Sequence, residues 1–321
     1  MAFVQKGDEV ILLEPVFQMY EYQIYLAGGT PRFVPVHAPP NSKSTTVSGN
    51  KWTVDLKELE AAINPNTRML VLNNPHNPIG KCYTREELLA IGRLCVKHDI
   101  ILMADEVYEH LNFDKTHIPV APLDPEIASH TLTAHSLGKL FNATGWRIGF
   151  VIGPQHLMSC VVNAHLITAY ASSSPAQEAA AQGLRQAETN GFWASNNRDV
   201  EHRIGRICNT LRELEIPFVN PRGAYFLFVD ISRLNIPKNY PYPEYVATRG
   251  KDFKTCYWMI QEIGVSSIPG SCFYAPDHAH LGENYIRFGA CKSDEGLDLA
   301  TERLRKLKPI LAPKQTRGAR L

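Results

Sequence analysis

The chain has 321 residues, and its 33 lysines and arginines almost balance its 32 aspartates and glutamates. A net charge near zero excludes the broad basic surface that nucleic acids and anionic membranes attract, so we expect neither kind of partner. The length favours two domains, or one large domain with a smaller one.

The seven cysteines are scattered along the chain and include no Cys-x-x-Cys pair. An odd set without paired spacing argues against a disulfide framework and a structural zinc site, so we expect no metal site. The pattern favours a reducing compartment, and we predict a cytoplasmic location. No apolar run approaches the length of a membrane span, and the N-terminus lacks the zones of a secretory signal.

Short apolar runs alternate with amphipathic stretches through the first part of the chain. Residues 9–15 are typical of a buried strand, 17–29 of a helix closed by glycines, and 30–36 of a second strand. Asp55 is expected to be the N-cap of a helix over 53–63. Strand-like and helix-like runs continue to alternate at residues 68–75, 85–99, 100–108, 131–136 and 147–154. This alternation predicts an α/β fold, a mostly parallel sheet covered by helices.

The second part of the chain has a different pattern. Residues 155–213 are largely helical, and strand-like runs follow at 224–232, 264–273 and 284–291. We therefore predict a smaller C-terminal α+β domain, and we place the division between residues 1–195 and 196–321.

Ligands of such sheets bind beyond the carboxyl ends of the strands, so polar residues beside the ends of apolar runs are candidates for a site. This rule selects four places, which are Asn73–Asn77, Asp105–Tyr108, Ser136–Lys139 and Arg147. A lysine amine such as Lys139 can form a Schiff base with an aldehyde if burial or nearby positive charge lowers its pKa. An aspartate ending a buried strand, such as Asp105, needs a cationic partner.

The remaining groups suit other parts of one ligand. Ser136 and Arg147 can bind a phosphate, and Asn77 and Tyr108 can donate to a phenolate oxygen. Pyridoxal 5'-phosphate combines an aldehyde, a pyridinium, a phenolate and a phosphate.

Each residue alone also has an ordinary interpretation. Lys139 alone would be a solvated loop lysine, and Asp105 could cap a helix. Asn77 could be a turn asparagine, and Ser136 and Arg147 could be surface residues. The combination at successive strand ends carries the prediction.

Four motifs in order resemble the class I/II, fold-type I pyridoxal-phosphate aminotransferases over essentially the whole chain. They are NNPHNPIGK, ADEVYEHLNF, HSLGKLFNATGWRIGF and NYIRFGAC. The resemblance implies that Lys139 binds the cofactor aldehyde and moves the substrate proton, that Asp105 pairs with the pyridinium, and that Tyr108 bonds the ring oxygen. These three are the expected catalytic residues.

The resemblance assigns further binding roles. Asn77 would bond the ring oxygen and contribute to substrate binding, while Ser136 and Arg147 would hold the phosphate. Phe17 would stack on the cofactor ring, although a hydrophobic staple at a helix start is the other interpretation. Arg287 would clamp the substrate carboxylate, and an ordinary structural ion pair is the alternative.

Within this family the chain looks most like the kynurenine aminotransferase and cysteine-S-conjugate β-lyase branch, also called glutamine transaminase K. That branch transfers the amino group of aromatic or sulfur-containing amino acids to a 2-oxo acid, and the resemblance implies a homodimer. Tyr170 and Ala171 depart from the branch, which often has phenylalanine and histidine there.

Members of the family begin well before the point that matches Met1, so an N-terminal part of the family pattern is expected to be missing, and a mitochondrial location is left open. Two functions follow from the sequence. The first is a transaminase with β-lyase side activity, and the alternative is a truncated protein with weak or no catalysis. A dinucleotide-binding oxidoreductase is disfavoured because no Gly-x-Gly-x-x-Gly follows a strand.

Overall fold

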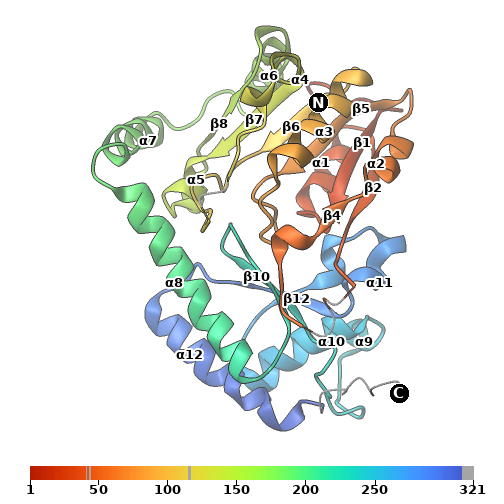
Figure 1. The fold of residues 1–321 in the computed structure, drawn as a ribbon, viewed down its shortest axis with the longest axis vertical. Coiled ribbons are helices and arrows are strands. Elements are labelled where there is room, and N and C mark those ends of the chain that lie inside the picture. Colours follow the sequence, from red (N-terminus) through yellow and green to blue (C-terminus); the bar gives the residue numbers. More distant parts are fainter. Residues whose placement is uncertain (41, 43–44, 115–116, 313–321) are drawn as a thin grey trace.

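A computed structural model of the chain describes residues 1–40, 42, 45–114 and 117–312. Its strands form two sheets, a larger one in the upper half of Figure 1 and a smaller one below. This arrangement confirms the predicted α/β fold with a second, smaller sheet.

The larger sheet has seven strands in the order β4-β2-β1-β5-β6-β7-β8. The five strands from β2 to β7 in this order run parallel, and β4 and β8 at the two edges are antiparallel to their neighbours. The strands are β1 (Glu9–Glu14), β2 (Thr30–His37), β4 (Thr53–Val54), β5 (Thr67–Asn73), β6 (Ile101–Asp105), β7 (Thr131–Ser136) and β8 (Gly149–Ile152). Buried parallel strands have continuous apolar runs, and β1 and β5 follow this rule.

Helices connect these strands, and their ends are set by local capping. The predicted cap is confirmed, because the Asp55 carboxylate accepts the backbone N–H of Lys57 at 2.8 Å. Thr84 and Glu87 form a reciprocal capping box. The helices of this half are α1 (Met19–Leu26), α2 (Leu56–Ala62), α3 (Arg85–Lys97), α4 (Pro125–His130), α5 (Leu137–Leu140), α6 (Gln155–Thr168) and α7 (Ser174–Ala187).

The smaller sheet has five strands in the order β11-β12-β10-β9-β3. Its members are β3 (Val47–Ser48), β9 (Phe218–Asn220), β10 (Phe226–Asp230), β11 (Ile268–Pro269) and β12 (Tyr285–Gly289). The accompanying helices are α8 (Phe192–Glu213), α9 (Glu244–Ala247), α10 (Lys251–Trp258), α11 (Ala279–Gly282) and α12 (Asp294–Leu304). The strand β3 comes from the first part of the chain and runs parallel to β9.

One predicted strand is much shorter than expected. Of residues 264–273 only Ile268–Pro269 is extended, and a 3-10 turn over Gly270–Phe273 follows. The reason is a close backbone approach, because a Cβ on Gly270 would lie 2.4 Å from the carbonyl oxygens of Gly282 and Tyr285. A glycine in an apolar run marks such an approach.

Other short turns complete the chain. Short 3-10 helices occur at Gly49–Lys51, Ala121–Leu123, Thr144–Trp146, Pro276–His278 and Arg305–Ile310, and a π-helical turn at Met259–Ile263.

The two halves share packing and a helix. One large cluster joins core residues of the larger sheet, such as Leu70 and Leu102, to Phe228 and Tyr285 of the smaller one. The helix α8 descends from the region of the larger sheet to the side of the smaller sheet, beside α12 (Figure 1). The predicted boundary at residue 195 falls inside this helix, and the division into 1–195 and 196–321 stays a prediction.

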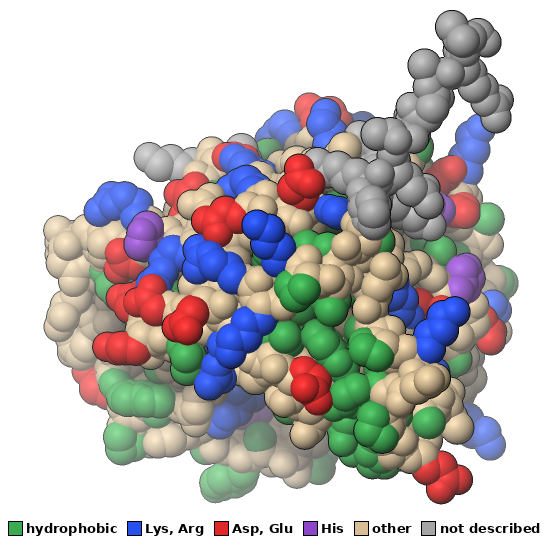
Figure 2. Space-filling view, turned by 90° about the horizontal axis from the view of Figure 1, so that it is seen from below, with side chains coloured by type: hydrophobic (Ala, Val, Ile, Leu, Met, Phe, Trp, Pro, Cys, Tyr) green, Lys and Arg blue, Asp and Glu red, His purple; other side chains and the backbone are tan. Residues whose placement is uncertain are grey.

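The distribution of surface charge and the polarity of the helices agree with the balanced charge and the lack of long apolar runs in the sequence. In Figure 2, which views the molecule from below, basic and acidic side chains are interspersed over the small-domain face. Within the described residues, none of the helices combines the length and apolar character that crossing a bilayer requires.

Candidate active site

The four places selected from the sequence lie at one edge of the larger sheet. In the strand register Asn73 is opposite Asp105, and Asp105 is opposite Ala134, so β5, β6 and β7 end together. Because β8 is antiparallel to β7, its beginning lies at the same edge, with Gly149 opposite Ser136. This pairing brings Arg147, which lies just before β8, close to the carboxyl ends of β5, β6 and β7.

Asp105 ends β6, and both of its carboxylate oxygens accept hydrogen bonds. Its Oδ2 accepts the hydroxyl of Tyr20, and its Oδ1 accepts the backbone N–H of Val107 at 3.3 Å. Burial raises the pKa of Asp105, while the two hydrogen bonds and the charge of Lys139 act in the opposite direction. A carboxylate in this position favours a cationic partner.

Lys139 lies in the short helix α5, which begins directly after β7. Burial lowers the pKa of its amine, and the charge of Arg147 lowers it further. The backbone is tight here, since a Cβ on Gly138 would lie 2.9 Å from the Cα of Thr144. Lys139 opens into a cavity of about 480 Å³ that is also lined by Asn142, Thr144, Val200, Arg203, Tyr225, Cys291, Lys292 and Ser293.

Arg147 and Ser136 flank this lysine. Arg147 has a left-handed backbone with φ of 56° and is exposed, and its Nη1 donates to the carbonyl of Thr144 at 3.0 Å. Ser136 is half-buried at the start of α5, and its side chain does not cap that helix. Both polar groups therefore remain available to an anionic ligand.

Arg287 and Asn77 form the opposite side of the site. Arg287 projects from β12, and its Nη1 donates to Oδ1 of Asn77 at 2.8 Å. Its guanidinium lies between two rings, 4.1 Å from the centroid of Phe226 and 4.8 Å from that of Phe273. Burial lowers the pKa of Arg287, and the side chain has a fork still able to bind a carboxylate.

Asn77 is itself fixed by the asparagine-rich loop after β5. Its backbone N–H donates to Oδ1 of Asn73 at 2.7 Å, and the side-chain amide of Asn73 donates to the carbonyl of Asp105 at 3.0 Å. The loop also contains cis peptide bonds before Pro75 and Pro78. The amide of Asn77 is thus connected to the strand end that carries Asp105.

Tyr108 is buried, with 4% of its surface exposed. Its ring packs edge-on against that of Tyr225, with the ring centroids 5.4 Å apart. Burial raises its pKa well above the usual value, and Tyr225 and Asp105 add to the increase. Phe17, two residues before the start of α1, is 40% exposed and packs edge-on against Tyr20. Exposure leaves the Phe17 ring able to contact a ligand.

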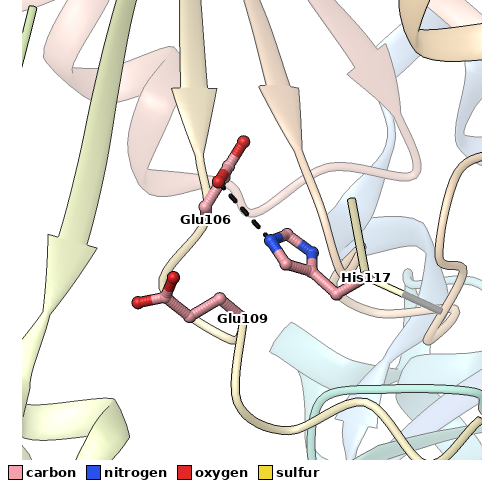
Figure 3. Close-up of side chains that lie close together, drawn as sticks. All are labelled: Glu106, Glu109 and His117. Atoms are coloured by element: carbon pink, nitrogen blue, oxygen red, sulfur yellow. Dashed lines mark ion pairs between the residues drawn. The ribbon is translucent and has the colours of Figure 1, made fainter. Parts of the chain in front are cut away.

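A partly buried cluster of glutamates and histidines supports the segment after β6. Figure 3 shows Glu106 and Glu109 on this segment, with His117 facing Glu106 at 3.4 Å. Glu106 also accepts the backbone N–H of Val120 at 2.8 Å. Glu109 accepts from Nδ1 of His135 at 2.9 Å, which joins the segment to β7. The positions of Asp105 and Tyr108 therefore depend on ion pairs on both sides of the segment.

Several residues at the site escaped the sequence reasoning. Tyr20 lies three residues after Phe17, a spacing that places both on one face of the helix predicted over 17–29, and this signal was available in the sequence. Tyr225 and Phe226 are adjacent to Arg287 only through the pairing of β10 with β12. Such long-range pairing leaves no local signal.

The fold and the site define the class of protein. Lys139, the buried Asp105 and Arg147 lie at the carboxyl edge of the larger sheet, and Arg287 of the smaller sheet bonds to Asn77 at that edge. The family model for aminotransferase class I and II matches residues 1–304. The chain belongs to this pyridoxal-phosphate-dependent family, and it is an aminotransferase.

Curated relatives and solved structures agree with the family. The chain is 42% identical to a probable kynurenine–oxoglutarate transaminase of Saccharomyces cerevisiae, a match covering 97% of this chain and 70% of the relative. It is 35% identical to human kynurenine–oxoglutarate transaminase 3, over 94% of this chain and 66% of the relative.

Among solved structures, Bna3p of Saccharomyces cerevisiae superposes with a TM-score of 0.94 at 42% identity, over 97% of this chain and 73% of that one. The N-succinyldiaminopimelate aminotransferase of Mycobacterium tuberculosis superposes with a TM-score of 0.81 at 32% identity, over 95% of this chain and 73% of that one.

The residues present fit the cofactor. Burial and the charge of Arg147 lower the pKa of the Lys139 amine, as an amine that reacts with an aldehyde requires. Asp105 is a buried carboxylate close enough to Lys139 for their charges to interact. The donor set therefore matches both the aldehyde and the ring nitrogen.

Proposed function

We propose that the protein transfers the amino group of an aromatic or sulfur-containing amino acid, of the kynurenine or glutamine type, to a 2-oxo acid. A cysteine-S-conjugate β-lyase side activity accompanies this transfer on substrates with a good leaving group. The observation that carries the proposal is the pair of Lys139 and Asp105 at the edge of the larger sheet, with Arg287 of the smaller sheet bonded to Asn77 there, together with the kynurenine transaminase relatives.

Lys139, Asp105 and Tyr108 are the proposed catalytic residues. When bound, pyridoxal phosphate supplies an aldehyde and an electron-withdrawing ring that stabilises negative charge at the substrate α-carbon. Lys139 supplies the amine and moves the proton at that carbon. Asp105 holds the proton on the ring nitrogen, and Tyr108 donates to the ring oxygen.

The binding residues orient the two ligands. Ser136 and Arg147 hold the phosphate, Phe17 stacks on the ring, and Asn77 donates to the ring oxygen. Arg287 binds the α-carboxylate of the amino acid and then that of the oxo acid. A bidentate contact at Arg287 fixes the direction of the α-carbon hydrogen, which is how binding energy assists the chemistry.

We also propose a cytoplasmic homodimer. Large apolar residues on and just after α6 are exposed, including Leu166 at 52% and Ile167 at 88% of their surface. An exposed apolar face of this kind is typical of a surface that a second subunit covers. Analytical ultracentrifugation of the protein and of Ile167→Asp tests this, and a monomeric wild-type protein would contradict the dimer.

The function is tested by adding pyridoxal phosphate to the purified protein. We expect an absorbance band from the bound cofactor that is absent in Lys139→Ala, because the band requires the amine. Lys97→Ala, a surface lysine paired with Glu60, is the matched control and keeps the band. Transfer to 2-oxoglutarate is then measured with kynurenine, glutamine and a cysteine conjugate, and a wild-type protein without a band would falsify the proposal.

A further inference from the structure

A tyrosine outside the predicted site contacts the carboxylate at its centre. Tyr20 lies in the first turn of α1, and its hydroxyl donates to Oδ2 of Asp105, at the end of β6. We propose that Tyr20 is a positioning residue that keeps Asp105 ionised and oriented toward the ring nitrogen of the cofactor. The inference rests on the proposed function, which assigns Asp105 to that nitrogen.

Asp105 needs such support because its surroundings disfavour its charge. Burial is the largest influence on its pKa and raises it, and the hydrogen bond from Tyr20 is the largest influence that lowers it. A protonated Asp105 could not hold a positive ring nitrogen. The Oδ1 atom receives the Val107 N–H at 3.3 Å, so the two donors fix the plane of the carboxyl group. Each oxygen retains a lone pair for a ligand.

A phenol is suited to this task because it stays protonated. Burial raises the pKa of Tyr20 well above its usual value, and the charge of Asp105 raises it further. The hydroxyl therefore remains a neutral donor over the working pH range. It adds no second charge that would compete with the ring nitrogen for Asp105.

Tyr20 also contacts the residue proposed to stack on the ring. The Phe17 and Tyr20 rings pack edge to face, with centroids 5.9 Å apart and an interplanar angle of 89°. One side chain thus touches both the ring-stacking residue and the ring-nitrogen carboxylate. The two contacts can be separated by mutation, since Tyr20→Phe keeps the packing and removes the hydroxyl, while Tyr20→Leu removes both.

The first experiment measures cofactor affinity against pH. Loss of the hydroxyl raises the pKa of Asp105, so Tyr20→Phe should bind pyridoxal phosphate roughly tenfold more weakly near neutral pH, as expected for a hydrogen bond to a charged group. As the pH is lowered, the affinity of Tyr20→Phe for pyridoxal phosphate should also begin to fall at a higher pH than that of the wild type. Tyr20→His, which retains a donor, should recover part of the loss.

The matched control is Tyr285→Phe, which removes a buried hydroxyl directed at Ser42 near the smaller sheet. If Tyr20 had a purely structural role, both variants would bind pyridoxal phosphate more weakly, and the pH at which the affinity falls would not move. An unchanged pH profile in Tyr20→Phe overturns the inference.

The second experiment needs no cofactor. Denaturant midpoints of the cofactor-free wild type, Tyr20→Phe, Asp105→Asn and the double variant form a cycle at neutral pH. We expect the two substitutions to be clearly non-additive, and additive shifts would overturn the pairing. If the wild type binds no pyridoxal phosphate, the proposed function fails while this cycle still decides whether Tyr20 supports Asp105.

Discussion

Two arginines are proposed to bind the two ends of the ligands, and the protein supports them very differently. Arg287 is held between Phe226 and Phe273 and bonded to Asn77, so three separate segments fix its guanidinium. Arg147 is exposed and contacts only a carbonyl of its own turn among the printed hydrogen bonds of the described residues. The proposed substrate side is therefore organised before binding, whereas the proposed phosphate side depends on a local turn.

The largest effect is expected at the preorganised side. Arg287→Leu removes the carboxylate clamp and leaves Asn77 without its donor, which should cost about 3 kcal/mol, or roughly a hundredfold in kcat/KM. KM should rise for both the amino acid and the oxo acid, because both carry the carboxylate. Steady-state kinetics check this, with the cofactor band unchanged. Arg287→Lys keeps the charge without the fork and should be intermediate, and an unchanged KM would contradict the assignment.

Arg147→Ala tests the exposed side. Loss of one charged hydrogen bond to the phosphate should weaken cofactor binding by about 2 kcal/mol. Since the charge of Arg147 lowers the pKa of Lys139, its removal raises that pKa, and the amine should react only at higher pH. The rate of band formation against pH measures the shift. Arg203→Ala, at the cavity that Lys139 lines and paired with Asp294, is the control, and equal effects would refute a specific role for Arg147.

A smaller effect, on stability, is expected at Glu109 on the segment after β6. Glu109→Gln breaks the half-buried pair with His135 and should lower the free energy of unfolding by about 1.5 kcal/mol. Burial raises the pKa of Glu109, but His135 outweighs it and the net shift is down from 4.5. Burial lowers the pKa of His135, but Glu109 outweighs it and the net shift is up from 6.5.

The sign of the pH dependence follows from these shifts. Because the pKa of the Glu109 carboxyl is lowered, this group stabilises the fold above pH 4.5, and the stabilisation is lost as the pH falls. Because the pKa of the His135 imidazole is raised, this group stabilises the fold below pH 6.5, and the stabilisation is lost as the pH rises. The loss in Glu109→Gln should thus be greatest between these values and shrink by pH 8. Urea unfolding across this range checks it, with the more exposed pair of Glu60 and His98 as a control. A pH-independent loss would point to packing alone.

The smallest effect is expected at the rings around Arg287. Phe226→Leu preserves much of the apolar contact and removes one cation–π face, which should cost about 0.7 kcal/mol. We expect KM to rise about threefold, with kcat and cofactor affinity nearly unchanged. A fall in kcat with an unchanged KM would show that the ring acts on the chemistry and not on the orientation of Arg287.

The sequence predicted the sheet and the polar strand ends because both leave local signals. Apolar runs mark β1, β5, β6 and β7, and the residues that follow them must meet at one edge of a parallel sheet. The roles given to Lys139 and Asp105 stay proposals, yet their neighbourhood was predictable from the chain order alone. The strand expected over 264–273 was mostly wrong because Gly270 marks a turn there.

What the sequence could not supply was pairing between distant segments. Phe226 reaches Arg287 because β10 pairs with β12, and Phe273 reaches it from a turn that follows β11. Neither contact has a periodic signature. Tyr20 is the exception, since its spacing from Phe17 was visible and only its direction toward Asp105 was not.

The parallel pairing of β3 with β9 bears on how the chain can be divided. Val47–Ser48 supplies the last strand of the smaller sheet, next to Val219 and Asn220. A fragment consisting of residues 196–321 alone would expose the edge of β9, and an open edge invites pairing with other chains. A useful dissection of this protein would therefore supply the early segment in trans, so that reassembly of the two pieces reports on the closure of the second sheet.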